Sequence, residues 1–198
     1  MALDEALLLV AKNPCLRLYR WSAPAATFGY AQRLADVRLR VGALPLVRRW
    51  TGGGIVFHGA DLTLALAVPA GVEICRKNSG DIYHEIHRAL LRGVREFIPN
   101  ARLAEPSDCL AGPACFEAPA LHDLISSGVK ICGGALRRSR RGILYQGSLH
   151  IKQTDRAGAI AHALSEVAGP LLQTLPVEEA ASSLETEKYG SSVWNELR

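Results

Sequence analysis

Three consecutive glycines preceded by two arginines are the residues best suited to chemistry, and they lie within 48–59, which read RRWTGGGIVFHG. Glycines have no side chain and can adopt positive φ, so several main-chain N–H groups can point at one ligand. An arginine such as Arg49 can pin an anion or orient a carbonyl. The glycine spacings of dinucleotide-binding and phosphate-binding loops are absent. The segment therefore indicates a ligand-binding loop, the alternative being a glycine-rich hairpin or bulge that binds nothing.

A cysteine and its potential partners form a second candidate group. Cys115 lies between Gly112-Pro113 and Pro119, which favours an irregular surface segment over the core. A free thiol becomes a good nucleophile when a nearby cation lowers its pKa or a base takes its proton. The candidates for this task are Lys130, His58 and His122. The alternative is an inert buried thiol.

Two other cysteines and two histidines complete the set of reactive side chains. Cys109 and Cys132 are rival nucleophiles, and Cys132 follows Lys130 by two residues, so on a strand the two should share a face. His84 and His87 lie three residues apart in a predicted helix. Because no clustered carboxylate or further histidine accompanies them, we expect helix-face residues and no metal site.

Composition indicates one domain spanning 1–198. The chain has 198 residues, of which 48% are hydrophobic, enough for a substantial core without disulfides or metals. No apolar run approaches the roughly 18 residues of a membrane span, and the first residues lack the basic region of a secretory signal. We expect a cytoplasmic protein that does not enter a membrane.

Cysteine spacing and charge limit the partners. The five cysteines include no Cys-x-x-Cys pair, which argues against a disulfide framework and a structural zinc site. The formal net charge of +4 is diffuse except in 137–141, which read RRSRR. Charge alone does not indicate a nucleic-acid partner. We expect this basic segment to be a solvated hairpin turn, with docking of an acidic protein as the alternative.

Apolar periodicity predicts the elements that position these residues. Helical spacing is expected in 2–12 and in a long helix that Ser79 caps and Pro99 ends, and Asp36 to Val41 is expected to form a helical turn. Large and small residues alternate in 62–68, as in a sheet buried on both faces. Further strands are expected at 16–19, 27–30, 45–50, 55–57, 123–125, 130–135 and 143–151, and closing helices at 155–168 and 177–187. This irregular mixture predicts the α+β class.

Several motifs together resemble those of a known family. They are the glycine loop, ACFEAP at 114–119, KICGGALRR at 130–138, QGSL at 146–149 and KYGSSVWN at 188–195. The chain resembles the lipoate-protein ligase and octanoyltransferase superfamily over nearly its full length. The resemblance implies a mixed β-sheet flanked by helices, as in the catalytic domain of biotin and lipoate protein ligases.

The resemblance also implies roles for individual residues. Lys130 is expected to contact the acyl carbonyl or acyl phosphate, where an ammonium in a dry pocket would stabilise developing negative charge. Cys115 is expected to be the nucleophile, as in cysteine-dependent octanoyltransferases and amidotransferases. The expected substrate-binding residues are Arg49, Thr51, Gly52, Gly53, Gly54, His58, Gly133 and Gly134.

Three functional hypotheses follow from the resemblance. The first is an acyltransferase that moves octanoyl, or lipoyl, from an acyl carrier protein through a thioester on Cys115 to a lysine of a lipoyl-carrier protein, without a cofactor. Both carriers are typically acidic. An amidotransferase that moves the acyl group between two lipoyl-carrier proteins would use the same residues, and the sequence does not separate the two. The second is a lipoate-protein ligase that forms lipoyl-adenylate and uses ATP and Mg²⁺. The third is a non-catalytic module that binds carrier proteins.

The sequence departs from the family pattern in three places. Only 196–198 follow the KYGSSVWN segment, so the accessory domain of many ligases is not expected, although a separate subunit could replace it. The strand that usually precedes the first helix is missing, which leaves open a start further upstream. Gln146 stands where many relatives have histidine.

Overall fold

The alternation of large and small residues in strand β5 (Leu62–Pro69) sets the layers of the molecule. Leu62, Leu64 and Leu66 belong to one buried cluster with residues of helices α3 (Ser79–Arg95) and α4 (Ala157–Ala168). Ala65 and Ala67 belong to another cluster on the opposite face, which includes residues of helix α1 (Ala2–Val10). The strand is therefore buried on both faces, as its pattern predicts.

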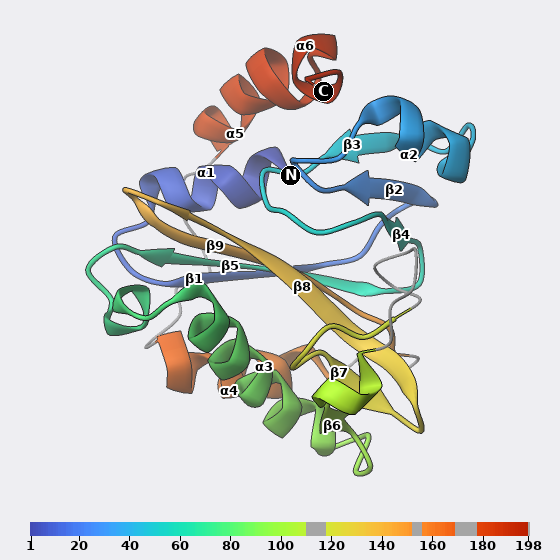
Figure 1. Cartoon of the computed structure of the whole chain (residues 1–198). Helices are drawn as coiled ribbons and strands as arrows, with labels where there is room; N and C mark the ends of the chain where they lie inside the picture. The colour runs from blue at the N-terminus through green and yellow to red at the C-terminus, as the bar shows by residue number, and fades with distance from the viewer. Residues whose placement is uncertain (110–117, 152–155, 169–177, 198) are drawn as a thin grey trace.

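The larger sheet has six antiparallel strands in the order β1-β5-β9-β8-β7-β6. Its other strands are β1 (Cys15–Tyr19), β6 (Arg102–Leu103), β7 (Leu124–Ser126), β8 (Val129–Ser139) and β9 (Gly142–Leu149). The structure is a computed structural model that describes residues 1–109, 118–151, 156–168 and 178–197. In Figure 1, α1 lies above this sheet and α3 and α4 lie below it.

A smaller mixed sheet lies beside the first and carries the glycine loop. Strand β2 (Ala25–Phe28) pairs in parallel with β3 (Leu46–Arg48) and antiparallel with β4 (Val56–His58). The loop joins β3 to β4, and helix α2 (Leu34–Val41) packs against this sheet through Val37 and Val41. Mixed strand pairing and flanking helices confirm the predicted α+β fold class.

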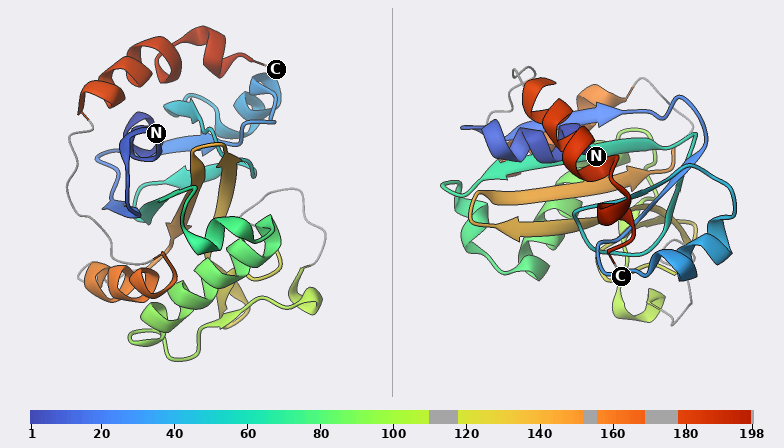
Figure 2. Two further views of the ribbon diagram at one scale, coloured as in Figure 1. Left: turned by 90° about the vertical axis from the view of Figure 1, so that its left-hand side faces the viewer. Right: turned by 90° about the horizontal axis from the view of Figure 1, so that it is seen from above.

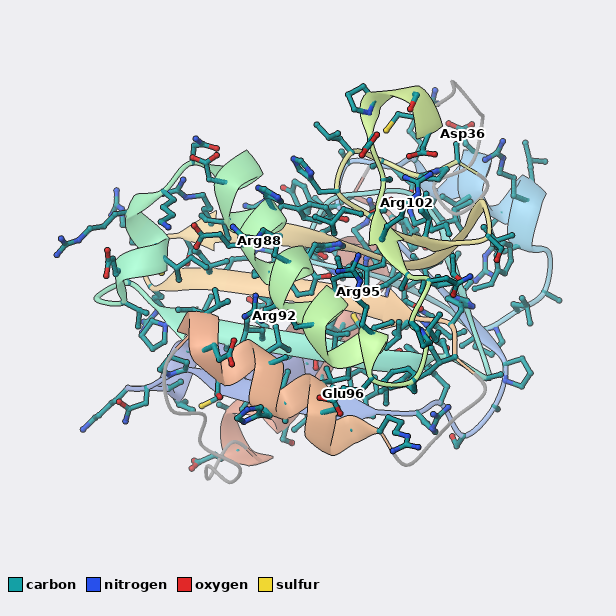
Figure 3. All side chains as sticks on the ribbon, turned by 90° about the horizontal axis from the view of Figure 1, so that it is seen from below. Asp36, Arg88, Arg92, Arg95, Glu96 and Arg102 are labelled. Atoms are coloured by element: carbon teal, nitrogen blue, oxygen red, sulfur yellow. The ribbon has the colours of Figure 1, made fainter. Side chains whose placement is uncertain are left out.

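The long helix α3 packs against the core through the apolar side that its sequence periodicity predicts. Its apolar stripe is buried, whereas Arg88, Arg92 and Arg95 are labelled along its other side in Figure 3. Arg92 makes an ion pair of 2.5 Å with Glu166 of α4. The prediction that Ser79 caps this helix is wrong, because the Asn78 side chain accepts the hydrogen bond from the Asp81 N–H and Asn78 is the N-cap.

The last described residues form a segment that we call the C-terminal strap, residues 178–197. It contains α5 (Glu178–Leu184), a π-helical turn (Glu185–Tyr189) and α6 (Ser192–Asn195). Figures 1 and 2 place the strap on the α1 side of the large sheet, opposite α3 and α4. Two short 3₁₀ turns, Glu73–Arg76 and Pro106–Asp108, complete the described elements. Among the described residues, no helix has the length and apolar character that a membrane span requires.

Candidate active site

The glycine loop is held in shape by Arg49 and by a close contact between two main-chain segments. Arg49 donates to the carbonyl oxygens of Gly52 at 3.0 Å and Gly54 at 2.8 Å. Gly53 has φ of +83°, which favours glycine. A Cβ built on Gly29 would lie 1.9 Å from the Gly53 oxygen, so Gly29 is needed for β2 to approach the loop. The guanidinium of Arg49 therefore shapes the loop from within.

His58, at the end of β4, lies in a buried polar network beside the loop. Its Nδ1 lies 2.9 Å from Asp61 Oδ2, and its Nε2 lies 2.8 Å from Thr27 Oγ1. The ring stacks on Trp21 with centroids 4.3 Å apart. Burial raises the pKa of Asp61, but hydrogen bonds from His58 and Ser148 outweigh it and hold that pKa well below its usual range. Asp61 is thus an ionised anchor that fixes the His58 ring.

Lys130 is held on β8 by a short hairpin. The turn between β7 and β8 contains Ser127 and Gly128 with φ of 50° and 77°, the positive values of a tight two-residue turn. The register shifts so that Leu124 pairs with Cys132 and Ile125 pairs with Lys130, which leaves one extra residue on β8. Such a bulge re-aims side chains.

The bulge separates Lys130 from Cys132. Lys130 extends over Gly133, because a Cβ built there would lie 2.4 Å from Lys130 Cε and 2.7 Å from Nζ. Cys132 is instead fully buried in the core cluster with Tyr145. The prediction that the two side chains share a face is therefore wrong, since the extra residue interrupts the alternation along the strand. Burial raises the pKa of the Cys132 thiol well above its usual range, which makes it a poor nucleophile.

An aspartate and a tyrosine complete the surroundings of Lys130. Asp123 Oδ2 lies 2.7 Å from Lys130 Nζ and also accepts the Ala120 N–H at 2.7 Å. The Tyr83 hydroxyl donates to Asp123 Oδ1 and accepts the Gly134 N–H at 3.1 Å. The Lys130 and Asp123 side chains are only 8% and 1% exposed. The ammonium is thus fixed in a mostly water-excluded place.

Gly134 has its own steric requirement. A Cβ built on it would lie 2.3 Å from the Tyr145 hydroxyl oxygen. That hydroxyl lies 2.8 Å from His87 Nε2, and the His87 ring stacks on Tyr83 with centroids 3.9 Å apart. Burial lowers the pKa of His87 to about 3, so this imidazole is neutral. Gly134 therefore makes room for a buried aromatic layer behind Lys130.

These residues surround one cavity of about 160 Å³ between the glycine loop and strands β8 and β9. An engineered apolar cavity of about 150 Å³ holds benzene, so the space can accept part of an acyl chain. Seven of the predicted site residues line it, namely Arg49, Gly53, Gly54, His58, Lys130, Gly133 and Gly134. The lining also includes residues outside the predicted set, among them Thr27, Thr63, Tyr83, Asp123, Gln146 and Ser148.

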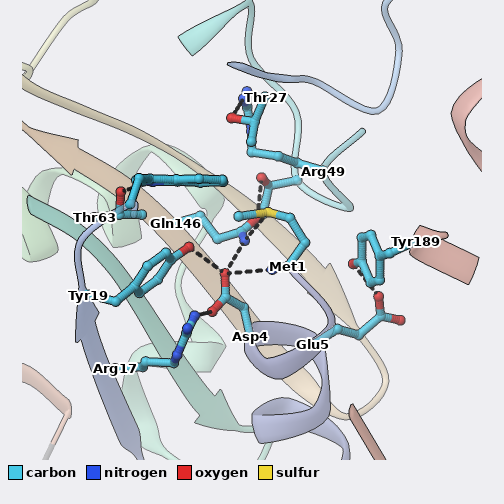
Figure 4. Close-up of polar contacts among 12 residues, drawn as sticks. Met1, Asp4, Glu5, Arg17, Tyr19, Thr27, Arg49, Thr63, Gln146 and Tyr189 are labelled. Atoms are coloured by element: carbon cyan, nitrogen blue, oxygen red, sulfur yellow. Dashed lines mark hydrogen bonds and ion pairs between the residues drawn. The ribbon is translucent and has the colours of Figure 1, made fainter. Parts of the chain in front are cut away.

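Gln146 connects the cavity to helix α1. Its side chain accepts a hydrogen bond from Thr51 Oγ1 at 2.8 Å and donates to Asp4 Oδ2 at 2.7 Å. Asp4 is fully buried and also binds Arg17 at 2.6 Å and the Tyr19 hydroxyl at 3.1 Å. Figure 4 shows these contacts converging on the Asp4 carboxylate. The α1 helix therefore fixes the amide orientation of a cavity residue.

Several predicted site residues lie elsewhere or outside the described residues. Thr51 is fully buried against Gln146, and Gly52 gives its carbonyl to Arg49, and neither lines the cavity. Cys115, the predicted nucleophile, lies outside the described residues. Cys109 and His122 do not line the cavity. Cys109 donates to the Glu105 carbonyl at 3.3 Å, and His122 stacks on His84.

The arginine-rich segment forms the β8–β9 hairpin, as predicted. Arg138 donates to the carbonyls of Lys77 at 2.7 Å and Cys75 at 3.0 Å, and Arg141 donates to the Leu9 carbonyl at 3.3 Å. The guanidinium of Arg137 lies over the Tyr30 ring, 5.0 Å from its centroid. These contacts hold the turn against neighbouring elements, and docking of an acidic partner stays a prediction. Among the described residues, no group of histidine, cysteine, aspartate and glutamate is arranged to hold a metal ion.

Comparisons with known proteins identify relatives of this chain. A family model described as the lipoyl protein ligase A/B catalytic domain matches residues 1–170. Octanoyltransferase LipM of Oceanobacillus iheyensis is 34% identical over 158 residues, which cover 75% of this chain and 58% of that protein. Octanoyltransferase LipM of an Exiguobacterium species is 30% identical over 204 residues, covering 95% of this chain and 74% of that protein.

A solved structure has the same fold. A lipoate-protein ligase A crystallised with ATP superposes with a TM-score of 0.74 at 20% identity, covering 98% of this chain and 91% of that one. The chain spans only 58% to 60% of the length of three curated LipM relatives that it matches. On the match over residues 1–170, the chain belongs to the lipoyl protein ligase A/B catalytic domain family.

Proposed function

We propose that the protein transfers an octanoyl group from an acyl carrier protein to a lysine of a lipoyl-carrier domain, through a thioester on Cys115. The observation that carries this proposal is the ammonium of Lys130, held over Gly133 in the cavity that the glycine loop encloses. The names of the LipM relatives support the acyl group and the reaction class. We place the reaction in the cytoplasm.

The proposed reaction has two acyl-transfer steps. The Cys115 thiolate attacks the carbonyl carbon of the octanoyl thioester, the carbonyl oxygen becomes negative, and collapse of this intermediate expels the carrier thiolate, which takes a proton from solvent or from a protein acid. The lysine amine of the acceptor then attacks the enzyme thioester, loses a proton and expels the Cys115 thiolate. In both steps Lys130 would stabilise the tetrahedral oxyanion more strongly than the neutral carbonyl.

The test is to mix the protein with octanoyl-loaded carrier in the absence of ATP and to measure its intact mass. We expect one octanoyl adduct on the wild-type protein that is lost in Cys115→Ser and kept in Cys109→Ser. Acceptor lipoyl domain should remove the adduct and gain the octanoyl group. An adduct that persists as a thioester in Cys115→Ser would remove this cysteine from its role.

The same experiment separates the other hypotheses. A solved ligase of the same fold was crystallised with ATP, so the ligase reaction is the second candidate. Modification of the lipoyl domain by free octanoate or lipoate only when ATP and Mg²⁺ are present, without an enzyme adduct, would establish the ligase in place of the transferase. Binding of carriers without either reaction would establish a non-catalytic module.

A further inference from the structure

The surroundings of Lys130 assign a task to two residues that the predicted catalytic pair does not include. Both oxygens of the Asp123 carboxylate are used by the structure. One contacts Lys130 Nζ at 2.7 Å and the Ala120 N–H, and the other accepts the Tyr83 hydroxyl. Because Asp123 is 1% exposed, water does not compete for these contacts. The carboxylate can therefore hold the ammonium in one position.

Tyr83 connects this carboxylate to helix α3. Burial and the neighbouring Asp123 raise the pKa of Tyr83 well above its usual range, so the hydroxyl keeps its proton. It therefore donates to Asp123 while it accepts the Gly134 N–H. The hydrogen bond to Gly134 ties the tyrosine to β8, the strand that carries Lys130. Position and orientation of the carboxylate are thus set by two separate elements.

Three further described titratable groups interact electrostatically with Lys130, and none of them is a carboxylate. The titratable groups that interact electrostatically with Lys130 or lie beside it are His87 on α3, Cys132 on β8 and His150 after β9, in addition to Asp123 and Tyr83. Burial lowers the pKa of both histidines and raises that of Cys132, so all three are neutral near pH 7. The carboxylate of Asp123 is the anion among these five groups.

We infer that Asp123, oriented by Tyr83, is a positioning residue that holds the Lys130 amine in one place and aims it over Gly133 into the cavity. The inference rests on the proposed function for its catalytic meaning. Lys130 then acts as a fixed cation toward the acyl oxygen and does not serve as the base that takes the Cys115 proton. Loss of Asp123 should free the amine from this position.

The first test measures the freedom of the amine directly and needs no acyl transfer. Wild-type, Asp123→Asn and Tyr83→Phe proteins are treated with an amine-acetylating reagent at one pH, and the time course of Lys130 acetylation is read by peptide mass spectrometry. An amine that is held against a buried carboxylate reacts slowly, because it must leave that contact to meet the reagent. We expect Lys130 to be acetylated about tenfold faster in Asp123→Asn, with a smaller increase in Tyr83→Phe.

A matched pair of variants controls for general loosening of the protein. Glu5 accepts contacts from Lys188 Nζ and the Tyr189 hydroxyl, the same chemical groups in a different place. Glu5→Gln should raise the acetylation rate of Lys188 and leave that of Lys130 unchanged. An unchanged acetylation rate of Lys130 in Asp123→Asn would overturn the inference. Should Asp123→Asn fail to fold, Tyr83→Phe removes a single hydroxyl, and an unchanged rate there would also overturn it.

The second test separates positioning from a general structural role. With octanoyl-loaded carrier, Asp123→Asn should lower kcat about tenfold to a hundredfold with little change in KM, because the carbonyl is bound but its oxyanion is less well stabilised. Equal loss in Glu5→Gln would count against positioning. A wild-type protein without acyl transfer would refute the proposed function, whereas the acetylation rates would still decide the inference.

Discussion

Two lysine–carboxylate–tyrosine trios in this molecule have the same chemical groups and different surroundings. Lys130, Asp123 and Tyr83 line the cavity. Lys188, Glu5 and Tyr189 join the C-terminal strap to α1, with Glu5 receiving Lys188 Nζ at 2.6 Å and the Tyr189 hydroxyl at 2.6 Å. Figure 4 shows Tyr189 facing Glu5 from the strap. The composition of a polar trio therefore does not by itself identify a functional lysine.

The two ammonium groups differ in what surrounds them on the side away from the carboxylate. Lys188 Nζ lies 4.2 Å from the Trp194 ring centroid and 5.0 Å from that of Trp50, so aromatic rings surround it. Lys130 lies against Gly133, which presents no side chain, at the wall of a cavity. Cation–π contacts stabilise the strap, whereas the missing Cβ of Gly133 leaves room for the Lys130 side chain to reach the cavity. A glycine beside the lysine is the more informative feature.

Removal of each lysine is the strongest way to test this comparison. Lys130→Ala should lower octanoyl transfer by about 100-fold or more, the loss typical of an oxyanion-stabilising group. Lys188→Ala should lower the free energy of unfolding by about 1 to 3 kcal/mol, because Glu5 loses a buried partner, and the folded fraction should keep its transfer rate. Rate assays and urea unfolding of both variants measure these effects. Equal rates in the two variants would mean that the cavity trio is also only structural.

Filling the space beside Lys130 should have the next largest effect. In Gly133→Ala the new methyl would lie 2.4 Å from Lys130 Cε, so the flexible lysine must move while the strand backbone stays. We expect the transfer rate to fall at least about tenfold with normal unfolding behaviour. Gly71→Ala is the control, since a Cβ there has no heavy atom within 4 Å. A normal rate in Gly133→Ala would show that the position of the amine does not matter.

The last expected effect concerns pH, because Tyr83 of the cavity trio stacks on a histidine. Burial lowers the pKa of His87 from 6.5 to about 3. Between these values the unfolded chain binds a proton that the folded chain does not, so the free energy of unfolding falls as pH decreases. His87 should contribute a slope of up to about 1.4 kcal/mol per pH unit across this window.

Chemical unfolding at several pH values measures that slope. His87→Gln should reduce it, and His162→Gln, which alters an exposed histidine of α4, should not. The slope is the readout, because His87→Gln also changes a buried hydrogen bond and lowers stability at every pH. The same slope in wild type and His87→Gln would indicate that other groups carry the acid sensitivity.

Local sequence patterns were sufficient for the elements that surround the site. The alternation in 62–68 and the stripe on α3 predict burial because side chains two residues apart on a strand, or three to four apart on a helix, share one face. The three glycines predict a loop that carries its neighbours close to a ligand. The extended segments predicted on either side of 137–141 indicate the hairpin. In each case the signal and the structure lie within a few residues.

Contacts between distant segments were not predictable in this way. Arg48 and Arg49 are adjacent and identical in type, yet Arg48 is fully buried and donates to the carbonyls of Trp194 and Asn195, whereas Arg49 holds the glycine loop. The sequence predicts Ser79 as the cap of α3 where the structure has Asn78, because asparagine and serine have similar capping preferences. Local residue type cannot distinguish such neighbours.

The sequence by itself determined the α+β class, the glycine loop and the candidate lysine, since strand and helix periodicity and motif spacing are properties of a short stretch of chain. The tertiary structure decided what surrounds that lysine. A single-residue bulge separates the side chains of Lys130 and Cys132. Packing of α3 brings Tyr83 into contact with Asp123, which lies 40 residues later in the sequence. Register shifts and packing of distant elements depend on the whole fold, because each is set by the combined free energy of many contacts.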